Sequence, residues 1–233
     1  MTAGPRWRLA EPRHGSLPVL LLALTLVTGV IDAVSLLALG WVFVANMTGN
    51  VVVTGFAIAG VPEFSLVTSL VVLAAFLLGA AAGGYLIQRI DQRGTLLRAA
   101  ALIEWVLLAV CLVMVLVRAP VVGSLWTVTT AALAAVAMGV QNAVARRIAV
   151  PDLNTSVVSM SMTGLAADYT HWTRDAVLRR AAAVLSLLVG AVVGAVIVGT
   201  LGAAAAFGLI LLLLAGVAAA AHTILRRGPD WDG

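Results

Sequence analysis

Long apolar stretches separated by short polar interruptions dominate the chain. A bilayer core takes about 20 mainly apolar residues per helix, and six stretches are long enough and poor enough in charge to span it. They run approximately over residues 18–40, 66–87, 99–117, 124–144, 181–200 and 204–224. The pattern therefore predicts an all-α integral membrane protein with six transmembrane helices, for which lipid is the main solvent.

Two of the polar interruptions resemble each other. Gly-Val-Ile-Asp-Ala-Val from Gly29 is followed by Asn-Met-Thr-Gly-Asn from Asn46, while Gly-Val-Gln-Asn-Ala-Val from Gly139 is followed by Asn-Thr-Ser from Asn154. Two pairs of glycines with the same spacing repeat in a similar way, namely Gly79 and Gly83, then Gly190 and Gly194. These echoes predict an internal duplication, with chance similarity in a chain of 22 glycines as the alternative.

The duplication would divide the chain near Pro120. Residues 17–119 form the first three-helix repeat and 120–225 the second, between tails at 1–16 and 226–233. A repeat with three spans reverses the membrane orientation of its copy, so the halves would be related by a pseudo-two-fold axis in the membrane plane. We therefore expect a 3+3 inverted repeat.

The basic residues support this orientation. All 14 are arginines, and if there are six spans, all except Arg118 fall on one side of the membrane. Such a bias marks the cytoplasmic side, which explains the net charge of +4 without nucleic acid as a partner. We expect a multi-pass protein of the bacterial plasma (inner) membrane with both termini in the cytoplasm.

Several kinds of chemistry are absent from the sequence. Without lysine the chain lacks the phosphate-binding residue of a P-loop and the amine of a Schiff-base site. It contains neither H-E-x-x-H nor G-x-S-x-G, and Cys111 is a lone cysteine inside an apolar stretch, typical of a packing residue. We expect no enzyme activity, no cofactor and no metal site.

The first predicted helix is too long for a bilayer if it continues to its polar end. Leu17 to Asn46 would measure about 45 Å as one helix, against a core of about 30 Å. Trp41 is a suitable interfacial anchor, after which Asn46 to Asn50 would unwind. The apolar residues 51–59 are too few to span, so they form either a surface helix or a re-entrant half-helix whose N-terminus points into the protein.

The second break is richer in hydroxyl groups. Pro151 ends the preceding run, Asn154 or Thr155 can cap a new helix, and Thr155, Ser159 and Thr163 then share one helical face. Half-helix N-termini that meet near the midplane would favour an anion or a polarised solute. Capping of short interfacial helices explains the same residues without a site.

Two carboxylic acids lie inside apolar spans. Asp32 is about fifteen residues into the first span, where a charged side chain is costly, so it must be protonated or have a partner. It is our candidate for proton coupling, and a hydrogen-bonded structural acid is the alternative. Asn142 takes its place in the second half. Glu104 is a weaker candidate, expected close enough to the cytoplasmic face to be hydrated.

At these residues the chain resembles the YoaK-like family of bacterial membrane proteins, whose domain is of unknown function. The resemblance implies a multi-span inner-membrane protein and brings no established substrate or mechanism. It covers most of the chain between the tails, and Met-Thr-Gly-Asn is its most specific part. The residues that carry it are Gly29 to Ser35, Asn46 to Val52, Gly139 to Ala143 with Arg146 and Arg147, and Pro151 to Thr155 running on to Thr163 to Asp168.

The hypothesis that combines these features is a small secondary transporter or permease for an unidentified small solute. Its alternatives are a channel and a non-transporting scaffold or accessory subunit. Copies of the chain could associate through the faces of the two glycine pairs. The solute site would bring the first break, Asn46, Thr48, Gly49 and Asn50, against the second break, Asn154, Thr155 and Ser156, with Ser159 and Thr163 beside it.

Overall fold

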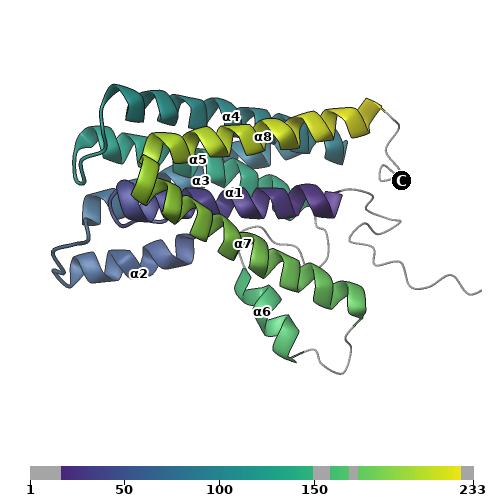
Figure 1. Ribbon diagram of the computed structural model, residues 1–233, viewed down its shortest axis with the longest axis horizontal. Coiled ribbons are helices and arrows are strands. Elements are labelled where there is room, and N and C mark those ends of the chain that lie inside the picture. Colours follow the sequence, from purple (N-terminus) through teal and green to yellow (C-terminus); the bar gives the residue numbers. More distant parts are fainter. Residues whose placement is uncertain (1–16, 149–157, 168–172, 227–233) are drawn as a thin grey trace, which may run out of the picture.

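The computed structural model describes residues 17–148, 158–167 and 173–226, which form six long helices and two short ones (Figure 1). Each of the long helices is long and apolar enough to cross a membrane, which confirms the predicted all-α fold and the six spans. The long helices are α1 (Leu17–Ala38), α3 (Leu66–Arg89), α4 (Arg93–Val117), α5 (Leu125–Ile148), α7 (Arg174–Leu201) and α8 (Ala203–Arg226); the short ones are α2 (Met47–Ile58) and α6 (Val158–Ala167).

Two helices form the centre of the bundle. In the most apolar 18-residue stretch of each helix, 67% of the residues are buried in α1 and in α5, against 22% in α3 and 17% in α7. These two helices precede the two polar breaks and contain the motifs that begin at Gly29 and Gly139. Both motifs therefore lie in the interior of the bundle. The more exposed α3 and α7 present apolar side chains such as Leu77, Leu78 and Val192 to their surroundings, as expected for helices that face lipid.

The closest packing joins helices from different halves of the sequence. Gly29 on α1 lies against the backbone of α7, where a methyl group would overlap the carbonyl oxygen of Leu187. Gly190 on α7 lies equally close to the carbonyl oxygen of Leu26. Small residues let the backbones of membrane helices approach in this way, so α1 and α7 are held together by matched glycines.

The same arrangement holds α3 against α5. A methyl group at Gly139 would overlap the carbonyl oxygen of Phe76, and one at Gly79 would overlap that of Val136. Each contact corresponds to one between α1 and α7 after a shift of 110 or 111 residues. Helices α4 and α8 pack against each other, and each packs against the first long helix of the other half of the sequence, α4 against α5 and α8 against α1.

These contacts overturn the expected role of the glycine pairs in association. Gly79, Gly83, Gly190 and Gly194 are all buried within the chain. Because α5 and α1 cover them, they do not offer a face to a second copy.

The short helices lie on one side of the bundle, below α1 in the view of Figure 1. Helix α2 packs against α3, and α6 packs against α7. The beginning of α1 and the end of α8 lie at the same end of the bundle, which is the arrangement that an even number of spans produces. A single residue, Gly202, joins α7 to α8 and has a φ of 86°, which favours glycine.

Candidate functional site

Asp32 lies where the chain folds back beside α1. Its Oδ1 accepts a hydrogen bond from the backbone N–H of Ala45 at 3.0 Å. Asp32 precedes the last residue of α1 by six positions, which is about 9 Å of helix. Residues 39–46 must therefore turn at the end of α1 and run back alongside it, so α2 begins next to Asp32 and within the length of the bundle (Figure 1).

The turn itself uses two unusual backbone conformations. Gly40 has a φ of 110° and Trp41 a φ of 58°, the left-handed region that L residues other than glycine rarely adopt. The indole of Trp41 is 45% exposed, as an interfacial anchor requires. The next apolar residues, Val42, Val44 and Ala45, are buried, and their burial holds the returning segment against the bundle.

Asn50 fixes the returning segment to α2. Its Oδ1 accepts a hydrogen bond from the backbone N–H of Phe43 at 2.8 Å, and its Nδ2 donates to the carbonyl oxygen of Phe43. The side chain is fully buried. With both ends of its amide used in this way, Asn50 serves the fold of the loop.

Asn46 is the N-cap of α2. Its Oδ1 accepts from the backbone N–H of Gly49 at 3.3 Å, as capping residues commonly do. The expectation that Asn46 to Asn50 unwinds was therefore wrong: the unwound residues precede Asn46, and Met47 to Asn50 form the first turn of α2. Thr48 is exposed, and Gly49 packs against the ring of Phe43.

The structure describes only part of the second break. Asn154, Thr155 and Ser156 lie outside the described residues. On α6, Ser159 and Thr163 are exposed, whereas Ser161 is buried and Gly164 lies against the guanidinium of Arg180 on α7. Among the described residues, α2 and α6 do not contact each other, so the predicted opposition of the breaks stays a prediction.

Glu104 belongs to a second polar group, in the middle of the bundle. Only 1% of its surface is exposed. One terminal atom of the Gln141 amide lies 2.7 and 3.0 Å from the two carboxyl oxygens of Glu104, and the other lies 3.1 Å from Oγ1 of Thr28. Helices α4, α5 and α1 are thus joined by the side chains of Glu104, Gln141 and Thr28.

The expectation of a hydrated Glu104 was therefore wrong. Helix α4 begins at Arg93, six residues before the predicted span. Glu104 consequently lies eleven residues, about 16 Å, inside the helix, on a side covered by α5. The sequence predicted the correct helix for Glu104 but placed the acid too close to the end of that helix.

Gln141 and Thr28 were missed by the sequence analysis. The repeat drew attention to Asn142, which aligns with Asp32 and is only partly buried, while its neighbour Gln141 is 2% exposed. An amide inside an apolar span is itself a sign of function or of helix pairing, and this signal marks Gln141 as clearly as Asn142. In the described parts of the chain, no three His, Cys, Asp or Glu side chains form a group that could hold a metal ion.

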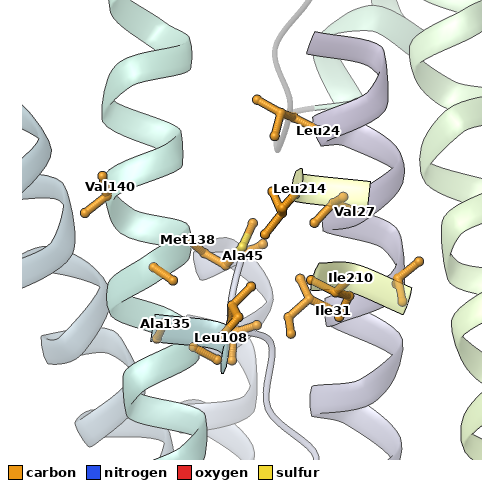
Figure 2. Packing of buried hydrophobic residues seen from close by; sticks show 14 of the residues in the cluster. Leu24, Val27, Ile31, Ala45, Leu108, Ala135, Met138, Val140, Ile210 and Leu214 are labelled. Atoms are coloured by element: carbon orange, nitrogen blue, oxygen red, sulfur yellow. The ribbon is translucent and has the colours of Figure 1, made fainter. Parts of the chain in front are cut away.

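An apolar layer fills the space between α1 and α5 (Figure 2). Val27 and Ile31 approach from α1 and Met138 from α5, with Leu108 of α4 and Ile210 of α8 between them. All of these side chains are fully buried or nearly so. Glu104 is therefore embedded in a tightly packed core, whereas Asp32, at the edge of this layer, is only partly buried.

Residues 20–220 match the family described as protein of unknown function, DUF1275. The chain belongs to this family. A member with a curated description is similar to it: the UPF0700 transmembrane protein YoaK of Bacillus subtilis (strain 168) is 28% identical over 188 residues, which cover 75% of this chain and 80% of that protein. No solved structure matches the chain. Together with the six apolar helices, the match identifies a multi-pass membrane protein of the DUF1275 family.

Proposed function

We propose that the chain is a small secondary transporter or permease in which Asp32 couples the movement of a small solute to protons. The observation that carries the proposal is the hydrogen bond between Asp32 and the backbone of Ala45, just before the first turn of α2. An ionisable group inside a membrane span marks a solute or proton pathway by default. Discontinuous helices that begin inside the membrane are common sites of substrate binding in secondary transporters.

The contacts of the glycines support an inverted repeat as the framework for transport. Equivalent glycines join α1 to α7 and α3 to α5, so each half contributes one helix to each pair. In transporters built from inverted repeats, rocking of one bundle against another exposes a central site to each side in turn. The division of this chain at Pro120 into two such repeats is part of the proposal.

Coupling follows from what the N–H groups near α2 can bind. The start of a helix has a partial positive charge, and here the protein's own carboxyl group lies beside it. An ionised Asp32 competes with an anionic solute for this position, whereas a protonated Asp32 no longer repels it. The proposal is therefore symport of a proton with a small anion.

The apolar layer argues against an open channel. Ile31, Met138 and Ile210 close the space between α1 and α5, and conduction would require these side chains to separate. A transporter that alternates between closed arrangements needs such a barrier. A non-transporting scaffold is the other alternative, and the experiment below distinguishes it.

The proposed orientation follows the arginines. Arg89 and Arg93 flank the turn between α3 and α4, whereas Arg118 is the one basic residue in the turn between α4 and α5. By the positive-inside rule, the turn between α3 and α4 and both termini face the cytoplasm. The proposed location is the bacterial plasma membrane.

Proton movement in vesicles tests the proposed function. Purified protein is reconstituted into liposomes that contain a pH-sensitive dye, and phosphate, sulfate or the neutral polyol glycerol is added outside. We expect acidification of the lumen with at least one of the charged probes and none with glycerol. Asp32→Asn should abolish the acidification, while Asp91→Asn, the same change at an exposed acid in the turn between α3 and α4, should leave it unchanged.

Three results would count against the proposal. Acidification that is equal in Asp32→Asn and in the wild type would remove Asp32 as the coupling group. A pH-independent ion conductance would favour a channel. Absence of movement with every probe, together with a partner protein that co-purifies in fixed ratio, would favour the scaffold.

A further inference from the structure

The Gln141 amide lies between an acid and a hydroxyl group from two other helices. Glu104, Gln141 and Thr28 are 1%, 2% and 1% exposed, so water does not compete for their hydrogen bonds. A buried amide must satisfy both its donor and its acceptor. The orientation of Gln141 is therefore determined by which of its two neighbours offers a proton.

The first orientation suits a protonated Glu104. The amide nitrogen of Gln141 then donates to Oγ1 of Thr28 at 3.1 Å, and Thr28 donates to the carbonyl oxygen of Leu24 at 2.9 Å. The amide oxygen faces Glu104, which satisfies both groups only if the acid donates a proton. The hydroxyl protons of Thr28 and of the protonated acid then each have an acceptor.

The opposite orientation suits an ionised Glu104. The amide nitrogen then lies 2.7 and 3.0 Å from the carboxylate oxygens, and the amide oxygen accepts from the hydroxyl of Thr28. Thr28 must release the carbonyl oxygen of Leu24 to make this bond, because a hydroxyl has one proton to donate. The protonation of Glu104 is thus transmitted to the backbone of α1.

Among the residues that the structure describes, the parts of α5 and α8 that pack against α4 carry no cationic side chain that could pair with an ionised Glu104. Helix α5 has no ionisable residue between Leu125 and Ala145, and α8 has none between Ala203 and Ala221. Within α4, the nearest basic residue, Arg98, is exposed, and Cys111 is buried with its Sγ against the carbonyl oxygen of Thr130. On α1 the one ionisable group is Asp32, and near the turn that joins α3 to α4, Arg89 lies over the ring of Tyr85.

We infer that Glu104 is a second proton-binding site, and that Gln141 transmits its protonation state to α1. Thr28 and Asp32 are one helical turn apart on the same face of α1, so the signal arrives next to the acid that the proposed function assigns to coupling. The role in coupling rests on that function, whereas proton binding by Glu104 does not. The two acids would then load and release protons in a linked order.

Infrared difference spectroscopy tests the inference directly. The wild-type protein in lipid nanodiscs is titrated between about pH 4 and pH 9, and the carbonyl stretch of protonated carboxyl groups is recorded. We expect one band from a buried acid that is missing in Glu104→Gln and retained in Asp32→Asn. Because this measurement needs no solute, it succeeds or fails independently of the vesicle assay.

Two variants test the amide as the connection. Gln141→Leu removes the donor of the ionised acid, and since hydrogen bonds to charged groups are the stronger kind, the midpoint of the Glu104 band should move to higher pH by about one unit. Thr28→Val should shift the same midpoint by a smaller amount. Thr25→Val is the matched control, because Thr25 is buried on α1 and also donates to the carbonyl four residues earlier, Leu21.

The inference is wrong if no band disappears in Glu104→Gln, since the acid then does not change its protonation in this range. It is also wrong in its second part if the midpoint is equal in the wild type, Gln141→Leu and Thr28→Val. A shift in Thr25→Val as large as that in Thr28→Val would likewise exclude transmission through the amide. If the band behaves as expected but the protein moves no solute in vesicles, Glu104 is a proton-binding site and the proposed transporter function is wrong.

Discussion

Asp32 and Ala45, thirteen positions apart, are joined by a hydrogen bond in which the backbone N–H of Ala45, just before α2, donates to a carboxyl oxygen of Asp32 on α1. The bond places the start of α2 beside the interior of α1 and not beyond its end. It also gives the acid a structural role in addition to the proposed coupling, and the two roles can be separated by substitution.

Asp32→Ala should destabilise the protein more than Asp32→Asn. Alanine leaves the N–H of Ala45 without its acceptor, which costs about 1–3 kcal/mol for a buried donor, whereas the amide oxygen of asparagine can still accept. Unfolding in mixed detergent micelles with increasing SDS gives the free energies. If the two variants lose equal stability, the hydrogen bond does not hold the turn.

Asn50→Ala should be more harmful than Asn46→Ala. Asn50 is buried and binds both the N–H and the carbonyl oxygen of Phe43. Its loss leaves these two backbone groups without a partner, which lowers the free energy of unfolding by about 1–3 kcal/mol for each buried group. Asn46 is an exposed cap, worth about 1 kcal/mol. Limited proteolysis at residues 39–46 measures the loosening of the turn; faster cleavage in Asn46→Ala than in Asn50→Ala would reverse the assignment.

Glycines at the helix crossings should not tolerate a methyl group. Gly29→Ala and Gly139→Ala each force the new Cβ into a carbonyl oxygen of the partner helix, so we expect a loss of about 1–3 kcal/mol or more. Gly84→Ala and Gly199→Ala are matched controls within α3 and α7, where nothing lies within 4 Å of an added Cβ. These controls should be neutral or slightly stabilising because alanine favours helices, as judged by thermal melting in detergent.

The orientation can be tested by cysteine labelling. Cys111 is buried, and the native protein in membranes should react with a maleimide only after denaturation. In a Cys111→Ala background, a cysteine at Val122, which is 56% exposed between α4 and α5, should react with an impermeant maleimide added to intact cells. A cysteine at Asp91 should react only after lysis, and the opposite pattern would invert the proposed topology.

The spans were predictable because their length and lack of charge depend on the bilayer alone. All six apolar stretches became long helices, and Cys111 is a buried packing residue as expected. The position of the first break was not predictable in the same way. The polar residues suggested a break from Asn46 to Asn50, but the chain leaves the helix earlier, before Asn46. The side chain of Asn50 holds this earlier segment by hydrogen bonds to the backbone of Phe43. The local sequence pattern does not predict this contact.

The environment of the acids also depends on tertiary packing. Asp32 was found from its sequence because a single charge in an apolar span is conspicuous. Glu104 was misplaced because its depth depends on where α4 begins and its surroundings on which face meets α5. The link through Gln141 to Thr28 joins residues 113 positions apart, and neither residue carries a charge that would have drawn attention.

The exchange of helices between the halves has a consequence for biosynthesis. Helix α1 is made first, but the groove for its Gly29 lies on α7, one of the last helices to leave the ribosome. Until α7 has been made, α1 stays in the bilayer or the insertion machinery, and the face that contains Gly29 has no helix packed against it. The assembly of the bundle is therefore completed only near the end of translation, and neither half can finish folding before the other is present.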